Sequence, residues 1–185
     1  MRVNQSYDER MNSKTTARAA GFLVEEGLLT GVGDTIEDIA HSFTQINSLQ
    51  ADQVRVMSFV PQKGTPLYKT SSANNLLELK IIALMRLVFP DRLIPASLDV
   101  EGITGLWERL DAGANVVTSL IPPSEGFVGV SQSTLNVDDG FRTVNGVLPI
   151  LRECGLTPAN LSEYRAFMKN RLSGEIGQVN AHCKL

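Results

Sequence analysis

The fold is decided by the run Val54-Arg55-Val56-Met57-Ser58-Phe59 and by two later runs of the same kind, Ile94-Pro95-Ala96-Ser97-Leu98-Asp99 and Val116-Val117-Thr118-Ser119-Leu120. Each run is short, rich in apolar side chains and followed by a segment with helical spacing of its apolar residues. A further strand candidate, residues 22–30, precedes them. Four strand–helix units in succession predict an α/β fold with a parallel sheet, either doubly wound or barrel-like.

Polar side chains stand in these runs where a strand buried on both faces should be apolar. Arg55 and Asp99 would each cost on the order of several kcal/mol inside a sheet unless a partner neutralises them. One interpretation is a structural salt bridge between the two side chains. The other is a ligand site, in which Arg55 binds a carboxylate and Asp99 binds an ammonium, the two ends of an amino acid.

Hydroxyl side chains add to the second interpretation. Ser97 and Asp99 lie two residues apart and therefore point to the same side of a strand. Thr118 and Ser119 are adjacent, so both reach one site only if the strand end bends. Because ligands of parallel α/β folds bind at the carboxyl ends of the strands, we expect these residues to form an amino-acid pocket there.

Composition excludes several other classes of function. The chain has 185 residues and a net charge of −3, which argues against nucleic acid or a membrane surface as a partner. No segment approaches the ~18 consecutive apolar residues of a membrane span. The two cysteines, Cys154 and Cys183, are far apart and indicate neither a disulfide framework nor a metal site, so we expect a cytoplasmic setting.

A glycine-containing segment, residues 27–34, follows the first strand candidate. Its backbone amides could approach a nucleotide, but Gly-x-Gly after a strand is also a common tight turn. The number of units is a second open question, because a full barrel needs eight strand–helix units in ~250 residues. Four units would leave two parallel edge strands open to association.

Several of these stretches resemble the radical S-adenosylmethionine (SAM) enzymes related to biotin synthase, and most of all their methylornithine synthase branch in pyrrolysine biosynthesis. The resemblance extends from about Arg2 to Arg171. Its most specific pieces are VRVMSFVPQKGTPL at residues 54–67 and IPASLDVEG at residues 94–102. Residues 6–11, 25–35 and 115–123 add to it.

The resemblance implies a (β/α)8 TIM-type barrel, of which residues 1–172 would be the C-terminal half, strands five to eight, and residues 173–185 a disordered tail. It implies that Arg10 holds the carboxylate of SAM and that Gly27, Gly31 and Asp34 lie near its adenine. The positions that match the amino-acid site of the family are Arg55, Ser97, Asp99, Thr118 and Ser119. It assigns no residue of this chain to the chemical step or to a metal.

The activity implied by the resemblance to the methylornithine synthase branch is the conversion of L-lysine to 3-methylornithine by a mutase, an isomerase in which a reduced [4Fe-4S] cluster cleaves SAM to a 5′-deoxyadenosyl radical. A Cys-x3-Cys-x2-Cys run holds that cluster, and this sequence contains no such run. We therefore expect the chain to be inactive without an N-terminal half-barrel as partner. Two alternatives remain: a biotin synthase-like or hydrogenase-maturation-like radical enzyme with another substrate, and a non-catalytic remnant that binds an amino acid.

Overall fold

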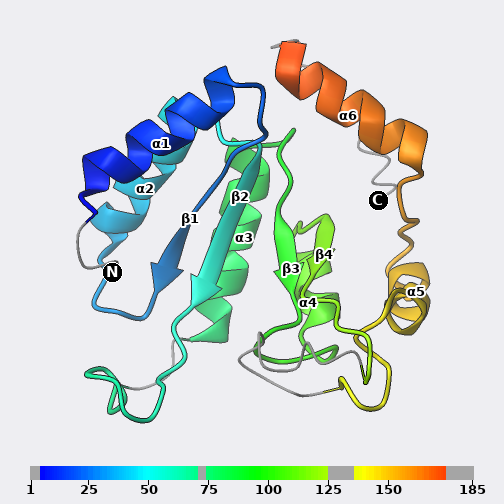
Figure 1. Cartoon of the computed structure of the whole chain (residues 1–185). Coiled ribbons are helices and arrows are strands. Elements are labelled where there is room, and N and C mark those ends of the chain that lie inside the picture. Colours follow the sequence, from blue (N-terminus) through cyan, green and yellow to red (C-terminus); the bar gives the residue numbers. More distant parts are fainter. Residues whose placement is uncertain (1–4, 71–73, 125–135, 174–185) are drawn as a thin grey trace.

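The computed structural model describes residues 5–70, 74–124 and 136–173, where parallel strands alternate with helices (Figure 1). The tail expected from residue 173 onward lies outside these ranges except for Ser173, which ends the last helix. The elements in chain order are α1 (Tyr7–Ala19), β1 (Glu25–Thr30), α2 (Ile36–Leu49), β2 (Gln53–Ser58), α3 (Asn75–Val88), β3 (Pro95–Ser97), α4 (Leu106–Asp111), β4 (Val116–Thr118), α5 (Val144–Glu153) and α6 (Leu161–Ser173).

The four strands are neighbours in the order in which they follow one another along the chain. β1 pairs with β2 and β3 pairs with β4, both in parallel. A parallel bridge between Gln53 and Leu93 joins the two pairs, and the amide of Val54 donates to the Leu93 carbonyl at 2.8 Å. The prediction of four parallel strand–helix units is therefore confirmed, in the arrangement of half a barrel.

Two predicted boundaries are wrong. The first strand begins at Glu25 rather than at residue 22, and Phe22 is 65% exposed. The sequence also predicts a helix over about residues 138–154. This helix begins only at Val144, because the Thr143 hydroxyl accepts a hydrogen bond from the Gly146 amide and so caps the helix there. Residues 138–142 form turns instead.

Local sequence explains where the first two helices begin. At the start of α1 the Ser6 hydroxyl accepts from the Glu9 amide while the Glu9 carboxylate accepts from the Ser6 amide. Thr35 and Asp38 repeat this reciprocal capping box at the start of α2. Each box satisfies backbone N–H groups that a helix end otherwise leaves without partners.

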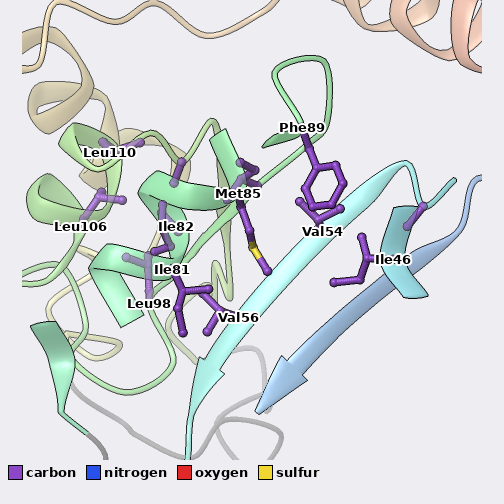
Figure 2. Packing of buried hydrophobic residues seen from close by; sticks show 14 of the residues in the cluster. Ile46, Val54, Val56, Ile81, Ile82, Met85, Phe89, Leu98, Leu106 and Leu110 are labelled. Atoms are coloured by element: carbon purple, nitrogen blue, oxygen red, sulfur yellow. The ribbon is translucent and has the colours of Figure 1, made fainter. Parts of the chain in front are cut away.

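The hydrophobic core lies between the strands and the helices that cover one face of them (Figures 1 and 2). Alternate residues of β2, Val54 and Val56, are buried there against α3. Ile82 and Met85 of α3 are at most 1% exposed. The other members with less than 2% exposure are Ile46, Ala51, Ile81, Ile94, Ala96, Leu98 and Leu106.

The strand residues that alternate with these core residues point the other way, to what we call the inner face. On β2 the inner-face residues are Arg55 and Met57, and on β3 they include Ser97. Thr118 is paired in register with Ser97 and continues this face onto β4. The pattern noticed in the sequence thus separates an apolar face from a polar one.

Buried charges tie the N-terminal ends of the strands to the first and last helices. The Asp52 carboxylate, 1% exposed, accepts from Arg18 of α1 at 2.9 Å and from Arg171 of α6 at 2.8 Å. It also accepts from the Val24 amide. Because this cluster lies at the end of the strands away from the predicted pocket, its role is to hold the fold together.

Candidate functional site

Three of the predicted residues come together where β3 and β4 end. The hydroxyls of Ser97 and Ser119 lie 3.2 Å apart, within hydrogen-bond distance. The amide of Asp99 donates to the Ser97 hydroxyl at 3.3 Å, which places the Asp99 carboxylate beside the same strand ends. The Asp99 side chain is 17% exposed, so it is shielded from water but still reachable.

Ser119 supplies the bend that the sequence requires for Thr118 and Ser119 to serve one site. Its φ of 63° lies in the left-handed region, which a serine adopts at a cost of about 1–2 kcal/mol. Arg142 offsets this cost, because its Nε and Nη2 atoms donate to the Ser119 carbonyl at 3.1 and 2.8 Å. Hydrogen bonds from a charged group contribute about 1.5–3 kcal/mol each.

Arg142 is a site residue that the sequence does not reveal. It stands alone among the turns before α5, and nothing in its neighbours marks it as buried. Yet its side chain is fully buried, and its Nη2 atom lies 3.8 Å from Oδ1 of Asp99. Burial lowers the pKa of the Arg142 guanidinium, and Asp99 opposes part of that shift. An arginine stays a cation in proteins at neutral pH.

Thr118 offers a hydroxyl that has no hydrogen-bond partner in the described part of the chain. Its Oγ1 atom is buried, and among the described residues it makes no hydrogen bond. A buried hydroxyl without a partner costs about 1–3 kcal/mol, so such groups in native proteins usually meet a ligand or an ordered water. The position of Thr118 opposite Ser97 makes a ligand at the inner face a direct explanation.

Arg55 and Asp99 have different partners, so the structure contradicts the interpretation that they pair with each other. The Nε atom of Arg55 lies 2.9 Å from Oε1 of Glu25 on the neighbouring strand. Glu25 is 43% exposed, so this pair is partly solvated and the Arg55 guanidinium stays accessible to a carboxylate ligand. Glu25, an acidic residue within the first strand, is therefore the counter-ion of Arg55.

The predicted cofactor residues fall into two places. Arg10 and Gly27 line a pocket of about 330 Å³ between α1, β1 and α2, together with Tyr7, Glu26, His41, Ser42, Gln45 and Ile46. The Arg10 guanidinium is 48% exposed and lies 3.6 Å from the Glu26 carboxylate. Its remaining N–H groups suit a carboxylate such as the one on the methionine end of SAM.

Gly31 and Asp34 form the turn after β1. Oδ1 of Asp34 accepts from the amides of Gly31 at 2.7 Å and of Val32 at 3.1 Å. Gly31 has a φ of 86°, which a residue with a side chain adopts only at a cost. The Asp34 carboxylate thus shapes this turn, and neither residue is among those that line the Arg10 pocket.

The residues of this chain do not fit an iron–sulfur cluster. A [4Fe-4S] cluster needs three closely spaced thiolates, and the sequence has two cysteines, of which Cys154 caps α5. Burial raises the pKa of the Cys154 thiol, which works against the thiolate that a metal requires. Within residues 5–70, 74–124 and 136–173, no group of three or more candidate ligands could hold a metal ion.

No helix in the described part of the chain is long and apolar enough to cross a membrane.

Comparison with known proteins adds a clear likeness. The chain is 45% identical over 168 residues to 3-methylornithine synthase of Methanosarcina barkeri, which is 91% of this chain and 48% of that protein. The crystal structure of methylornithine synthase (PylB) matches with a TM-score of 0.82 at 45% identity, over 90% of this chain and 50% of that one. No protein-family model matches.

More distant relatives widen the group. The [FeFe] hydrogenase maturase subunit HydE of Thermotoga maritima is 31% identical over 127 residues, 67% of this chain and 36% of that protein. Biotin synthases also match. The chain spans about half the length of the methylornithine synthases that it matches. In sequence and in fold, it is similar to one half of a methylornithine synthase within the biotin synthase-like radical SAM enzymes.

Proposed function

We propose that this chain supplies the C-terminal half-barrel of a radical SAM mutase that converts L-lysine to 3-methylornithine. In this proposal Arg55 holds the carboxylate of the amino acid and Asp99 holds its α-ammonium. The hydroxyls of Ser97, Thr118 and Ser119 orient the ligand between these two charges. The likeness to methylornithine synthase gives the reaction class its support.

One observation carries the proposal. The Arg55 guanidinium, the Asp99 carboxylate and three hydroxyls lie on the inner face or at the strand ends that border it. The opposite face of the same strands is apolar. Within this set the Thr118 hydroxyl is buried and has no hydrogen-bond partner among the described residues. A zwitterionic amino acid fits these groups, because its carboxylate can pair with Arg55 and accept from a hydroxyl such as that of Thr118, while its ammonium can pair with Asp99.

Completion of the barrel requires a partner half. β4 pairs only with β3 in the described part of the chain, and beside it an apolar pocket of about 330 Å³ lies between α4, α5 and residues 156–159. An exposed strand edge next to apolar surface favours association with another strand. We infer that an N-terminal half-barrel, in the same or another polypeptide, adds its strands there and carries the cluster.

The cofactor enters this proposal through Arg10 and the segment from Gly27 to Asp34. Arg10 would bind the carboxylate of SAM, and the turn that Asp34 shapes would approach its adenine. When bound next to a cluster held by the other half, SAM would supply the radical chemistry of the reaction. The residues of this chain bind, orient and shield the substrate.

The experiment that tests the proposal supplies the missing half. The chain is mixed under anaerobic conditions with the separately produced N-terminal half of the M. barkeri methylornithine synthase, its cluster is reconstituted, and SAM, L-lysine and a reductant are added. We expect lysine-dependent formation of 5′-deoxyadenosine and of 3-methylornithine. The mixture that contains Asp99→Asn is the control. SAM cleavage that depends neither on lysine nor on this substitution would contradict the proposal.

A second candidate function, binding of an amino acid without catalysis, follows from the presence of the pocket residues in a sequence with two distant cysteines. Like the first candidate it predicts that the chain binds L-lysine, but it predicts that the mixture makes no product. The same experiment therefore separates the two candidates.

A further inference from the structure

Arg142 is a buried cation at the edge of the proposed amino-acid pocket. It lies in the turn before α5, and its side chain reaches back to the end of β4. Its Nη2 atom donates to the Ser119 carbonyl at 2.8 Å and lies 3.8 Å from Oδ1 of Asp99. One nitrogen thus stands between two of the residues proposed to hold the ligand.

We propose that Arg142 is a positioning residue of this pocket, which fixes Ser119 and aims the Asp99 carboxylate at the α-ammonium of the amino acid. The inference rests on the proposed function, since it takes an amino acid as the ligand. None of the Arg142 side chain is accessible to solvent. It therefore acts through Ser119 and Asp99 rather than by touching the ligand.

The planar guanidinium suits this role better than an ammonium would. Two of its nitrogens, Nε and Nη2, both donate to the Ser119 carbonyl oxygen from fixed directions. These two hydrogen bonds hold the backbone of Ser119 at its φ of 63°, so that its hydroxyl stays within hydrogen-bond distance of Ser97. A lysine carries its charge at one point and cannot reproduce such a fork.

Arg142 is itself held in place on both sides. Its amide donates to the Asn136 carbonyl at 3.2 Å, and its carbonyl accepts from the Ile121 amide at 2.7 Å. The Asn136 side chain in turn accepts from the Ile103 amide at 3.1 Å. These bonds connect the turn before α5 to both strand ends, so the position of Arg142 is set before any ligand arrives.

The role has a consequence for selectivity. If Arg142 aims Asp99 at an α-ammonium, loss of the Arg142 side chain lowers the affinity for ligands that carry this group. The affinity for ligands that lack it stays the same. L-lysine has an α-ammonium, whereas 6-aminohexanoate keeps the carboxylate and the terminal ammonium and lacks it. If Arg142 only stabilised the fold, its loss would lower the affinity for both ligands equally.

The test measures the affinity of the full chain for both ligands by calorimetry. The variants are Arg142→Met, Arg142→Lys and, as a matched control on exposed α5 surface, Arg152→Met. We expect Arg142→Met to lower the affinity for L-lysine at least ten-fold and the affinity for 6-aminohexanoate less than two-fold. The affinity of Arg142→Lys for L-lysine should lie between those of Arg142→Met and the original chain. The affinity of Arg152→Met should equal that of the original chain. Equal losses for the two ligands, or no loss, would overturn the inference.

A second measurement keeps this inference separate from the proposed function. The carbon chemical shifts and the amide coupling of Ser119 in nuclear magnetic resonance spectra report its left-handed backbone without any ligand. We expect them to move toward extended values in Arg142→Met and to stay unchanged in Arg152→Met. If the original chain binds neither ligand, the proposed function fails. Unchanged Ser119 signals in Arg142→Met would then refute the positioning role on their own.

Discussion

The side-chain oxygens of Ser97 and Ser119 lie 3.2 Å apart although the two residues belong to different strands. In a regular parallel pair Ser97 faces Thr118, and Ser119 would point to the opposite side. The left-handed backbone of Ser119 turns its hydroxyl back toward the inner face. This local departure from strand geometry is what gathers the hydroxyls beside Asp99.

Asp99 is the residue whose charge the proposed pocket needs most. We expect Asp99→Asn to keep the shape of the side chain but to lose the attraction for an ammonium, at a cost of about 1.5–3 kcal/mol of lysine binding. This corresponds to a loss of affinity of roughly 10- to 150-fold. Calorimetry on the variant measures it, with Asp111→Asn, an exposed carboxylate at the end of α4, as control. An unchanged affinity would mean that Asp99 serves the fold alone.

Gly27 of β1 is paired in register with Arg55 of β2. A Cβ atom at this position would overlap the backbone carbonyl of Arg55, so Gly27→Ala must push the two strands apart. We expect a loss of about 1–3 kcal/mol in the free energy of unfolding, measured with urea, and reduced exchange protection of the Arg55 amide. Gly33→Ala is the control, because its φ of 101° makes it costly while no atom lies within 4 Å of the added Cβ. That variant should lose stability and leave the Arg55 amide protected.

Arg171 holds α6 against the N-terminal ends of the strands. Its guanidinium contacts Asp52 at 2.8 Å and Asp91 at 2.7 Å. We expect Arg171→Ala to lower the free energy of unfolding by about 1.5–3 kcal/mol and to speed amide exchange throughout α6. Arg165→Ala, an exposed arginine of the same helix, should change neither quantity. Equal effects of the two substitutions would show that Asp52 does not anchor this helix.

Asp38 makes the stability of α2 depend on pH. Hydrogen bonds from the backbone amide and the hydroxyl of Thr35 lower the pKa of the Asp38 carboxyl below its ordinary value of 3.8. Because the folded pKa lies below the unfolded one, this contribution is fully present above about pH 4 and disappears as the pH falls through the folded pKa. We expect Asp38→Asn to remove that part of the acid sensitivity between pH 2 and pH 5, as measured by thermal unfolding. Identical pH profiles for the two chains would contradict this role of the capping box.

Much of the fold was predictable because it depends on patterns that are local in sequence. The alternation of Val54, Arg55 and Val56 indicates a strand with one apolar and one polar face, and this is what the structure shows. The capping residue of α5 was missed, because Thr143 competes with several other polar residues in the preceding turns.

The site was predictable only in part. Ser97, Asp99 and Thr118 stand out because polar groups are unexpected inside strands. Arg142 could not be found in this way, since an arginine in a polar turn looks like a solvated residue and its burial depends on contacts between distant segments. The partner of Arg55 was likewise hidden, because the register of β1 and β2 decides that Glu25 and not Asp99 reaches it.

A crystal structure of the chain with bound L-lysine would show whether these side chains form the amino-acid pocket. We expect one lysine on the inner face, with its carboxylate at the Arg55 guanidinium, its α-ammonium at the Asp99 carboxylate and the Thr118 hydroxyl in a hydrogen bond with the ligand. Lysine bound away from these residues, or a pocket that remains empty at saturating lysine, would contradict it.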